Sequence, residues 1–437
     1  MELDVLHGEV PLADAVDAAR AHYIDRNPES RRRLETARQF MPGGNTRSVL
    51  YYGPFPIVLA RGEGCRLWDV DQHEYVDALG EFTAGLVGHN HPVIRAALIE
   101  TFDNGINLGG HNTLEPELAR IICERFASID RVRFTNSGTE ANLMAIVLAQ
   151  VFTDRKKIVV FSGGYHGSIL GFTEVSPATA PHDFIILPYN DTARVVETLA
   201  AQGKDVAAVL VEPMLGAGGC IPADPEFLAT IRAETEKVGA LMILDEVMTS
   251  RMSGGGRQQL LGLTPDLTTL GKYIGGGMSF GAFGGRQEIM ALFDPGAPKA
   301  LQHAGTFNNN VLTMAAGIAS MSEIFTAERA DAFYALGEAF RDRLNAICRA
   351  HDVAMQFTGL GSVMNVQFRS APIRTFEDAT DQDTKLKELY FLDMIEAGIY
   401  IARRGLTTLM LPMADTDLDR IAAAVETFVV RRKAYLG

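Results

Sequence analysis

One lysine of this sequence stands where covalent chemistry is possible. Lys272 follows the strand-like run of residues 267–270 after one glycine, and it is surrounded by glycines in the stretch Leu-Gly-Lys-Tyr-Ile-Gly-Gly-Gly (270–277). Lysines mostly lie on solvated surfaces, so an ordinary surface loop is the alternative interpretation. If the protein buries this side chain, desolvation lowers its pKa and produces the neutral amine that attacks a carbonyl group.

A second motif is suited to binding a phosphate group. Residues 134–140 read Phe-Thr-Asn-Ser-Gly-Thr-Glu, and a strand-like run passes into a helical pattern through Ser137, Gly138 and Thr139. The first N–H groups of a helix have no partner within it, and the positive end of the helix dipole attracts anions. The same letters are typical of an ordinary helix cap, so both interpretations stay open for this motif alone.

Acidic and aromatic side chains follow three further apolar runs. Asp245 and Glu212 each stand at the end of such a run, and Tyr165 lies among glycines in Ser-Gly-Gly-Tyr-His-Gly (162–167). An aromatic ring in such a loop could stack on a planar ligand, although a plain loop is the simpler interpretation. Together with the lysine and the phosphate motif, these residues are what pyridoxal phosphate requires: an amine, an acid for the ring nitrogen, a stacking ring and an anion site.

Several other chemistries lack their sequence signals. The chain has no G-x-x-x-x-G-K-[ST], no G-x-G-x-x-G, no H-E-x-x-H and no G-x-S-x-G, which argues against ATPase, dinucleotide, zinc-protease and serine-hydrolase chemistry. The four cysteines are far apart, at Cys65, Cys123, Cys220 and Cys348. This spacing supports no zinc site and is typical of a reduced intracellular protein, and we predict no metal.

The elements that must position these residues follow from the apolar pattern. Strand-like runs alternate with helical stretches such as 140–152 and 225–238, and the runs occupy residues 131–135, 157–161, 184–187, 207–211, 241–244 and 267–270. Continuous apolar strands separated by helices predict an α/β fold with a mostly parallel sheet that helices cover on both faces. Ligands bind such sheets at the carboxyl ends of the strands, where all five motifs stand.

The pattern changes after residue 325 and predicts a smaller α+β unit. A long helix over 327–351 precedes strands near 354–357 and 364–368 and helices over 385–397 and 415–433. Near the start, helices are expected over residues 11–38, with a break at Asn27-Pro28. We therefore expect a large cofactor-binding domain over residues 76–325 and a small domain formed by residues 1–75 and 326–437.

The motifs taken together resemble those of class III aminotransferases, a fold-type I family that depends on pyridoxal phosphate. The resemblance runs from about Met41 to the C-terminus. It rests on Gly88-His89-Asn90-His91-Pro92, Asn136-Ser137-Gly138-Thr139-Glu140-Ala141, Tyr165-His166-Gly167, Val211-Glu212-Pro213, Asp245-Glu246-Val247-Met248-Thr249, Leu270-Gly271-Lys272 and Gly305-Thr306-Phe307-Asn308. His89 and His91 are expected to be structural parts of their turn.

The resemblance implies a role for each site residue. Lys272 would bind the cofactor as a Schiff base and move the proton between substrate and cofactor carbons, Asp245 would pair with the ring nitrogen, and Tyr165 would stack on the ring. Further cofactor contacts would come from Ser137, Gly138 and Thr139 at the phosphate and from His166, Glu212 and Val247. Thr306 would reach the phosphate of the neighbouring subunit, which implies a homodimer with shared active sites.

Within this family the sequence resembles two groups, the β-phenylalanine (β-amino acid) aminotransferases and the glutamate-1-semialdehyde aminomutases. The aminomutases usually read Asn-Ser-Pro-Val-Arg after a Pro-Gly-Gly turn, whereas this chain reads Asn45-Thr46-Arg47 and lacks the proline. That arrangement resembles the β-phenylalanine group, and Arg404 stands at its matching C-terminal position. The expected reaction moves an amino group from a β-amino acid to 2-oxoglutarate or pyruvate; the aminomutase, an isomerase, is the alternative.

Two arginines suit an enzyme whose single site must accept both an amino donor and a keto acid. Guanidinium groups are planar and bind carboxylates through two parallel hydrogen bonds. Arg47 would hold the carboxylate of a β-amino acid. Arg404 would hold the second carboxylate of 2-oxoglutarate and swing away when an aryl group fills the pocket. The alternative is that Arg404 belongs to a surface ion pair, because the adjacent Arg403 cannot share its direction.

Composition sets the remaining expectations. The 437 residues carry 40 basic and 54 acidic side chains, a formal net charge of −14, which disfavours binding to nucleic acid. No stretch reaches the ~18 apolar residues of a membrane span. The first residues, Met1 to Val5, lack the apolar core of a signal peptide. We expect a cytoplasmic enzyme whose partners are a small amino donor, a keto acid and a second copy of itself.

Overall fold

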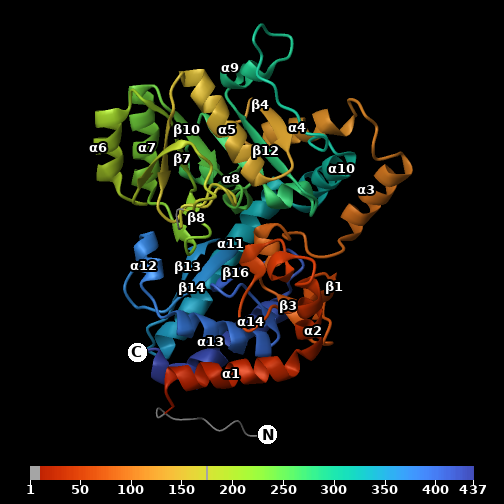
Figure 1. The fold of residues 1–437 in the computed structure, drawn as a ribbon, viewed down its shortest axis with the longest axis vertical. Coiled ribbons are helices and arrows are strands. Elements are labelled where there is room, and N and C mark those ends of the chain that lie inside the picture. The colour runs from red at the N-terminus through yellow and green to blue at the C-terminus, as the bar shows by residue number, and fades with distance from the viewer. Residues whose placement is uncertain (1–9, 174–175) are drawn as a thin grey trace.

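The computed structural model describes residues 10–173 and 176–437 (Figure 1). The segment Met1 to Val5, on which the expectation about a signal peptide rests, lies outside the described residues. Within the described ranges, no helix combines the length and the apolar character that crossing a membrane requires.

A seven-stranded sheet forms the centre of the larger part of the molecule. Its strands, in spatial order, are β4 (Arg131–Thr135), β12 (Gly281–Gly285), β11 (Leu267–Gly271), β10 (Leu241–Asp245), β7 (Val206–Val211), β5 (Lys157–Phe161) and β6 (Asp183–Leu187). All neighbouring strands pair in parallel except at β12, which is antiparallel to both β4 and β11. The predicted mostly parallel sheet is confirmed, and all six predicted strands belong to it.

The strand β12 has no counterpart among the sequence-based predictions, because its residues Gly-Ala-Phe-Gly-Gly carry neither an apolar run nor an alternating pattern. The glycines are required by close backbone approach. A Cβ at Gly281 would lie 2.1 Å from the carbonyl oxygen of Ser137, and a Cβ at Gly285 would lie 2.1 Å from that of Asp266. The strand therefore fits between β4 and β11 only without side chains at these positions.

Helices cover both faces of this sheet, as predicted. On one face, Val160 of β5 belongs to the same apolar cluster as Leu148 of α5 (Gly138–Thr153). On the other face, the adjacent strand residue Val159 clusters with Phe227 of α7 (Pro225–Val238), beside α6 (Thr192–Gln202). Successive strand residues point to opposite faces, so both faces are apolar. Burying each such side chain stabilises the fold by about 1.5–3 kcal/mol.

The smaller part of the molecule combines both ends of the chain. At the bottom of Figure 1, α1 (Leu12–Arg26) lies along α13 (Thr384–Glu396). The strand β3 (Glu74–Asp77) pairs in parallel with β15 (Ile399–Tyr400), matching Val76 with Ile399. The other elements of this region are α2 (Pro28–Ala37), β1 (Leu59–Glu63), β2 (Arg66–Asp69), α11 (Ala327–Ala350), β13 (Gln356–Leu360), β14 (Val363–Gln367), β16 (Leu406–Thr408) and α14 (Asp415–Arg432).

Shorter elements and connecting helices complete the chain. They are α3 (Pro92–Asp103), α4 (Leu114–Arg125), β8 (Met214–Leu215), β9 (Ile221–Pro222), α8 (Gly256–Leu261), α9 (Gln287–Met290), α10 (Val311–Ala319) and α12 (Phe376–Thr380). The helix break predicted at Asn27-Pro28 separates α1 from α2, since Pro28 is the first residue of α2 and cannot continue the preceding helix.

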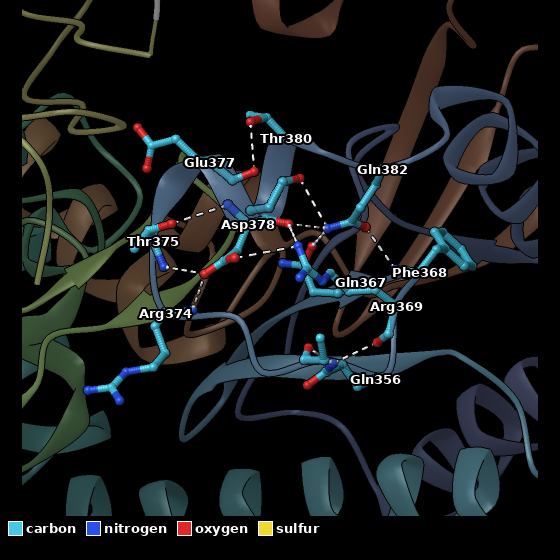
Figure 2. Close-up of polar contacts among 12 residues, drawn as sticks. Gln356, Gln367, Phe368, Arg369, Arg374, Thr375, Glu377, Asp378, Thr380 and Gln382 are labelled. Atoms are coloured by element: carbon cyan, nitrogen blue, oxygen red, sulfur yellow. Dashed lines mark hydrogen bonds and ion pairs between the residues drawn. The ribbon is translucent and has the colours of Figure 1, made fainter.

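Side-chain hydrogen bonds fix α12 against β14 (Figure 2). The carboxylate of Asp378 accepts the backbone N–H groups of Arg374 and Thr375, both at 3.0 Å, and the Thr375 hydroxyl accepts the N–H of Asp378 at 3.2 Å. Gln382 donates to the side-chain oxygen of Gln367 in β14 at 2.7 Å. This capping box and its neighbours give a five-residue helix a fixed position that its own length would not provide.

Candidate active site

The carboxyl ends of β4, β10 and β11 meet around one valine. Val247 follows β10, and its side chain packs against both Gly138 and Gly271: a Cβ at these glycines would lie 3.0 Å and 3.2 Å from its methyl carbons. Gly138 opens α5 directly after β4, and Gly271 precedes Lys272. Val247, two residues after Asp245, therefore lies beside both the predicted phosphate motif and the glycine that precedes Lys272.

Asp245 is buried and held by three hydrogen bonds. Its Oδ1 accepts the backbone N–H of Val247 at 3.0 Å, and its Oδ2 accepts the side-chain amide of Asn142 at 2.8 Å. Nδ1 of His166 lies 2.7 Å from the same Oδ2 and donates to it. A carboxylate offers about four acceptor positions, so one position on Oδ1 is left for a further donor, such as a protonated ring nitrogen.

The N-terminus of α5 has the geometry of an anion site and also contains a helix cap. The Ser137 hydroxyl accepts the N–H of Glu140 at 3.2 Å, which confirms the capping interpretation of this motif. The N–H groups of Gly138 and Thr139 belong to the first turn, where a helix supplies no partner. The Thr139 side chain lies against Gly167, where a Cβ would approach its hydroxyl oxygen to 2.2 Å. The loop that carries Tyr165 thus borders this helix start.

Tyr165 stands beside these groups with 46% of its surface exposed, which leaves its ring free to contact a ligand. Its backbone N–H donates to Oε2 of Glu212 at 3.0 Å, while Oε1 of Glu212 accepts the N–H of Gly216 at 3.1 Å. Burial, with a contribution from the Asp245 carboxylate, raises the pKa of Glu212 to about 7. Glu212 therefore joins two loops by accepting a backbone N–H from each.

The loop before Tyr165 is supported by α12. The Phe376 ring fills the space beside Gly163, where a Cβ would lie 2.6 Å from its Cγ, and the Ser162 hydroxyl donates to Oε1 of Glu377 at 3.2 Å. Gly163 has φ of 82°, a conformation that favours glycine. The helix α12, which is far from this loop in the sequence, therefore holds the loop in place through these two contacts.

Lys272 has the environment that an amine nucleophile needs. It follows β11 with φ of 55°, and its Nζ donates to the carbonyl oxygen of Phe82 at 2.6 Å. Burial, and next the positive charge of Arg404, lower the pKa of Lys272 to about 8. A usable fraction of the amine is therefore neutral near pH 7–8. Lys272 is partly buried and its amine is hydrogen-bonded to the backbone, so it is not an ordinary solvated surface lysine.

The two adjacent arginines of the C-terminal motif point to different surroundings. Arg403 makes the ion pair, with Glu388 at 2.8 Å. Arg404 is partly buried near Lys272 and Glu212, and burial lowers its pKa. In the described part of the chain no carboxylate pairs with Arg404, and its buried Nε has no hydrogen-bond partner. The ion-pair alternative considered for Arg404 therefore applies to Arg403 instead.

Arg47 reaches the same place from the N-terminal side. It pairs with Glu81 at the surface, and its guanidinium carbon lies 5.6 Å from the centre of the Phe82 ring. The guanidinium carbon of Arg404 lies 5.4 Å from that ring. The structure thus brings both predicted substrate-binding arginines to one aromatic side chain, whose carbonyl group contacts Lys272.

Thr306 lies apart from the other predicted residues, in an exposed loop. It borders a cavity of about 750 Å³ that is also lined by residues 106–112 and Phe307. Asn308 of the same loop accepts a hydrogen bond at 2.9 Å from the side chain of Asn136, which precedes the phosphate motif. The exposed position is compatible with a contact to another subunit, and the role of Thr306 stays a prediction.

Two groups of contacts were not predicted. Asn142, in the apolar stretch of α5, donates both to Asp245 and to the carbonyl oxygen of His166 at 3.1 Å; an amide among apolar helix residues was a usable signal. The contacts of Phe82 were also not predicted, and no sequence pattern around this residue indicated them. His89 and His91 are structural, as predicted, because His89 contacts Asp77 at 2.9 Å and His91 caps α3. Among the described residues, no group of three or more His, Cys, Asp or Glu side chains is arranged for a metal.

An α/β sheet whose strand ends carry a helix start with free N–H groups, a buried carboxylate with an open acceptor position and a lysine of lowered pKa fits a pyridoxal-phosphate transferase. The sequence matches the family "Aminotransferase class-III" over residues 50–430. The chain belongs to this family, and its cofactor is pyridoxal phosphate, for which the residues at the strand ends are suited.

Three relatives place the chain within the family. A β-phenylalanine transaminase of Variovorax paradoxus is 54% identical, and the match covers 95% of this chain and 96% of that protein. A glutamate-1-semialdehyde 2,1-aminomutase of Brevibacillus brevis is 36% identical, covering 91% and 97%. The crystal structure of a β-phenylalanine aminotransferase from Variovorax paradoxus matches with a TM-score of 0.96 and 53% identity, over 98% of this chain and 99% of that one.

Proposed function

We propose that this transaminase moves the amino group of an aromatic β-amino acid, such as β-phenylalanine, to 2-oxoglutarate or pyruvate. The observation that carries the proposal is the pair of arginines, Arg47 and Arg404, whose guanidinium groups both lie near the ring of Phe82, the residue whose carbonyl oxygen contacts Lys272. The similarity to a β-phenylalanine transaminase supports the donor class. The second guanidinium group, without a carboxylate partner in the described chain, supports a dicarboxylate acceptor.

Each residue would act through groups already in position. Pyridoxal phosphate, when bound, supplies an aldehyde that binds the amino group and a ring that withdraws electrons from the reacting carbon. The Nζ of Lys272 accepts the proton from the substrate carbon and returns it, since its lowered pKa suits general base work. The free acceptor position of Asp245 holds a proton on the ring nitrogen, and Asn142 and His166 fix that carboxylate.

The remaining predicted contacts surround the ring and the phosphate. Tyr165 and Val247 would contact the two faces of the cofactor ring. The side chain of Tyr165 is exposed, and Val247 packs between the ends of the strands. Glu212 holds the Tyr165 loop. The hydroxyl groups and N–H groups at the start of α5 would bind the phosphate, and they come from Ser137, Gly138 and Thr139.

We also propose a homodimer in which Thr306 binds the phosphate in the site of the other subunit. The exposed position of its loop supports this arrangement. The four free cysteines support the cytoplasm as the compartment. The division into a large domain (76–325) and a small domain (1–75 and 326–437) stays a proposal, and β3 crosses its first boundary.

A panel of amino donors tests the reaction. β-Phenylalanine, β-alanine, aliphatic ω-amines and glutamate semialdehyde are each incubated with and without 2-oxoglutarate, and products are measured. We expect turnover of β-phenylalanine only when the keto acid is present. Conversion of glutamate semialdehyde without a keto acid would instead identify an aminomutase. Lys272→Ala is the control and should abolish both turnover and the visible absorbance of the Schiff base between this lysine and the cofactor.

A matched pair of variants tests the acceptor site. Arg404→Ala should raise KM for 2-oxoglutarate roughly 10- to 100-fold, because charge-assisted hydrogen bonds contribute about 1.5–3 kcal/mol, and should change KM for pyruvate much less. Arg403→Ala, which removes the adjacent ion pair with Glu388, should leave both values near those of the wild type. Equal losses for the two keto acids in Arg404→Ala would contradict the proposed role.

A further inference from the structure

The turn that carries Phe82 has an unusual backbone. Four successive residues have positive φ: Gly80 at 52°, Glu81 at 49°, Phe82 at 54° and Thr83 at 80°. The left-handed conformation is unfavourable for residues with a Cβ, and three of these four have one. Such a run persists only where surrounding contacts fix it, and fixed strain of this kind concentrates at functional sites.

Buried polar groups fix both ends of this turn. Oδ1 of Asp77 accepts the N–H groups of Leu79 and Gly80, each at 2.9 Å, and His89 contacts the other carboxylate oxygen at 2.9 Å. At the far end, the fully buried Arg251 donates to the carbonyl oxygen of Thr83 at 3.3 Å. Both ends of the turn are thus held by hydrogen bonds other than the contacts of Phe82 with Lys272, Arg47 and Arg404.

The turn contacts all three cations of the site through one residue. The centre of the Phe82 ring lies 5.6 Å from the guanidinium carbon of Arg47 and 5.4 Å from that of Arg404, and the Phe82 carbonyl oxygen accepts a hydrogen bond from the Lys272 amine at 2.6 Å. Phe82 is buried, with 9% of the residue exposed, whereas the side chain of Arg47 is 44% exposed. With this left-handed backbone, the Phe82 ring contacts the two arginines while the Phe82 carbonyl group contacts Lys272.

Arg404 and Lys272 are both positive and repel each other, and Arg404 accordingly lowers the pKa of Lys272. A carboxylate partner would relieve the repulsion but would compete with the carboxylates of the substrates. The face of an aromatic ring attracts a guanidinium group without occupying its hydrogen-bond donors. Arg47 has a carboxylate neighbour, Glu81, but that pair is solvent-exposed and therefore weak, so a substrate can displace it.

We propose that Phe82 is a positioning and specificity-determining residue: its ring holds Arg404 ready for the second carboxylate of the acceptor, and its carbonyl group orients the free amine of Lys272. The proposal rests on the proposed function for the identity of the acceptor. It predicts that removing the ring weakens dicarboxylates selectively, because a monocarboxylate does not need Arg404.

The test compares three variants of the holoenzyme. Phe82→Leu removes the ring, Phe82→Tyr keeps it, and Phe152→Leu makes the same change at a half-exposed position at the end of α5. Binding of glutarate, a dicarboxylate that cannot react, is measured by titration calorimetry, and KM and kcat are measured with 2-oxoglutarate and with pyruvate. Thermal unfolding of each variant is recorded, and Phe82→Met repeats the test if Phe82→Leu is unstable.

Phe82→Leu should weaken glutarate binding and raise KM for 2-oxoglutarate by roughly 3- to 30-fold, the range expected for a lost cation–ring contact. KM for pyruvate should change less than about twofold on the same basis. Phe82→Tyr should restore wild-type values, and Phe152→Leu should match the wild type. Unchanged glutarate binding, or equal losses with both keto acids, would overturn the proposal.

The calorimetric measurement separates this proposal from the proposed function. If β-amino acids are not donors but Phe82→Leu still loses glutarate selectively, the donor assignment fails and the role of Phe82 stands. If β-phenylalanine is turned over with 2-oxoglutarate but Phe82→Leu binds glutarate normally, the function stands and the role of Phe82 fails.

Discussion

Lys272 connects the burial of one side chain to the pH at which the enzyme can take up its cofactor. Only the neutral amine attacks the aldehyde of pyridoxal phosphate, and burial with the nearby charge of Arg404 lowers the pKa of the amine to about 8. Below that pKa the neutral fraction falls about tenfold per pH unit. The rate of cofactor uptake should therefore rise with pH up to about 8 and then level off.

The measurement is the rate of absorbance change when pyridoxal phosphate is mixed with the cofactor-free enzyme between pH 6 and about 10. Arg404→Ala should move the midpoint to higher pH, because it removes a positive charge that disfavours the protonated amine. Arg403→Ala should leave the midpoint in place, since that side chain is paired with Glu388. A midpoint at the ordinary lysine value in the wild type would contradict the argument.

At the scale of elements, the glycines of β12 are expected to affect both the stability of the sheet and the affinity for the cofactor, and the two effects can be measured separately. A Cβ at Gly281 or at Gly285 would lie 2.1 Å from a backbone carbonyl oxygen, so either alanine variant overpacks the sheet. Each should lower the free energy of unfolding by about 1–3 kcal/mol, measured by denaturant titration. The carbonyl group next to Gly281 is that of Ser137, at the start of α5, whereas Gly285 faces Asp266 at the opposite end of the strand.

Only one of these two variants should also change cofactor affinity. Gly281→Ala should displace the turn that leads into α5, the helix proposed to bind the phosphate, so its affinity for pyridoxal phosphate should fall along with its stability. Gly285→Ala is the matched control and should bind the cofactor like the wild type in an equilibrium titration. A loss of affinity in both variants would mean that the effect is one of general stability.

These strands also mark how far sequence reasoning reached. Residues 131–135 and 157–161 were predicted with the bounds that β4 and β5 have. In β5, which is parallel to both of its neighbours, the signal is the buried apolar run Ile-Val-Val-Phe. β12 has no such apolar run, because the close approach of neighbouring backbone atoms leaves room only for glycine at several of its positions. Phe82 was missed for a different reason: its left-handed backbone is imposed by Asp77 and Arg251, and no local letter pattern encodes contacts of that kind.

At the scale of the whole molecule, the proposed dimer can be tested by mixing two inactive or weakened subunits. If Thr306 serves the site of the other subunit, a hybrid of Lys272→Ala with Thr306→Ala contains one site with both defects and one intact site. Loss of one hydrogen bond to a phosphate should weaken cofactor binding by roughly 10- to 100-fold in the Thr306→Ala homodimer.

Activity of the hybrid at limiting pyridoxal phosphate decides between the two arrangements. Wild-type cofactor affinity in half of the sites is expected if Thr306 acts across the interface. If Thr306 acts within its own subunit, every site that retains Lys272 stays weakened. Sedimentation of the wild type provides the independent measurement, and a monomer would rule out shared sites.

The pairing of β3 with β15 has a consequence for how the protein is made. Phe82 follows the first of these strands and Arg404 follows the second, and the two strands match Val76 with Ile399. During synthesis on the ribosome, β3 cannot pair with β15 until nearly all of the chain has been made. Contacts so distant in sequence also slow folding. The nascent chain can thus complete the strands of the larger sheet long before Phe82 and Arg404, the residues proposed to select the acceptor, are brought together.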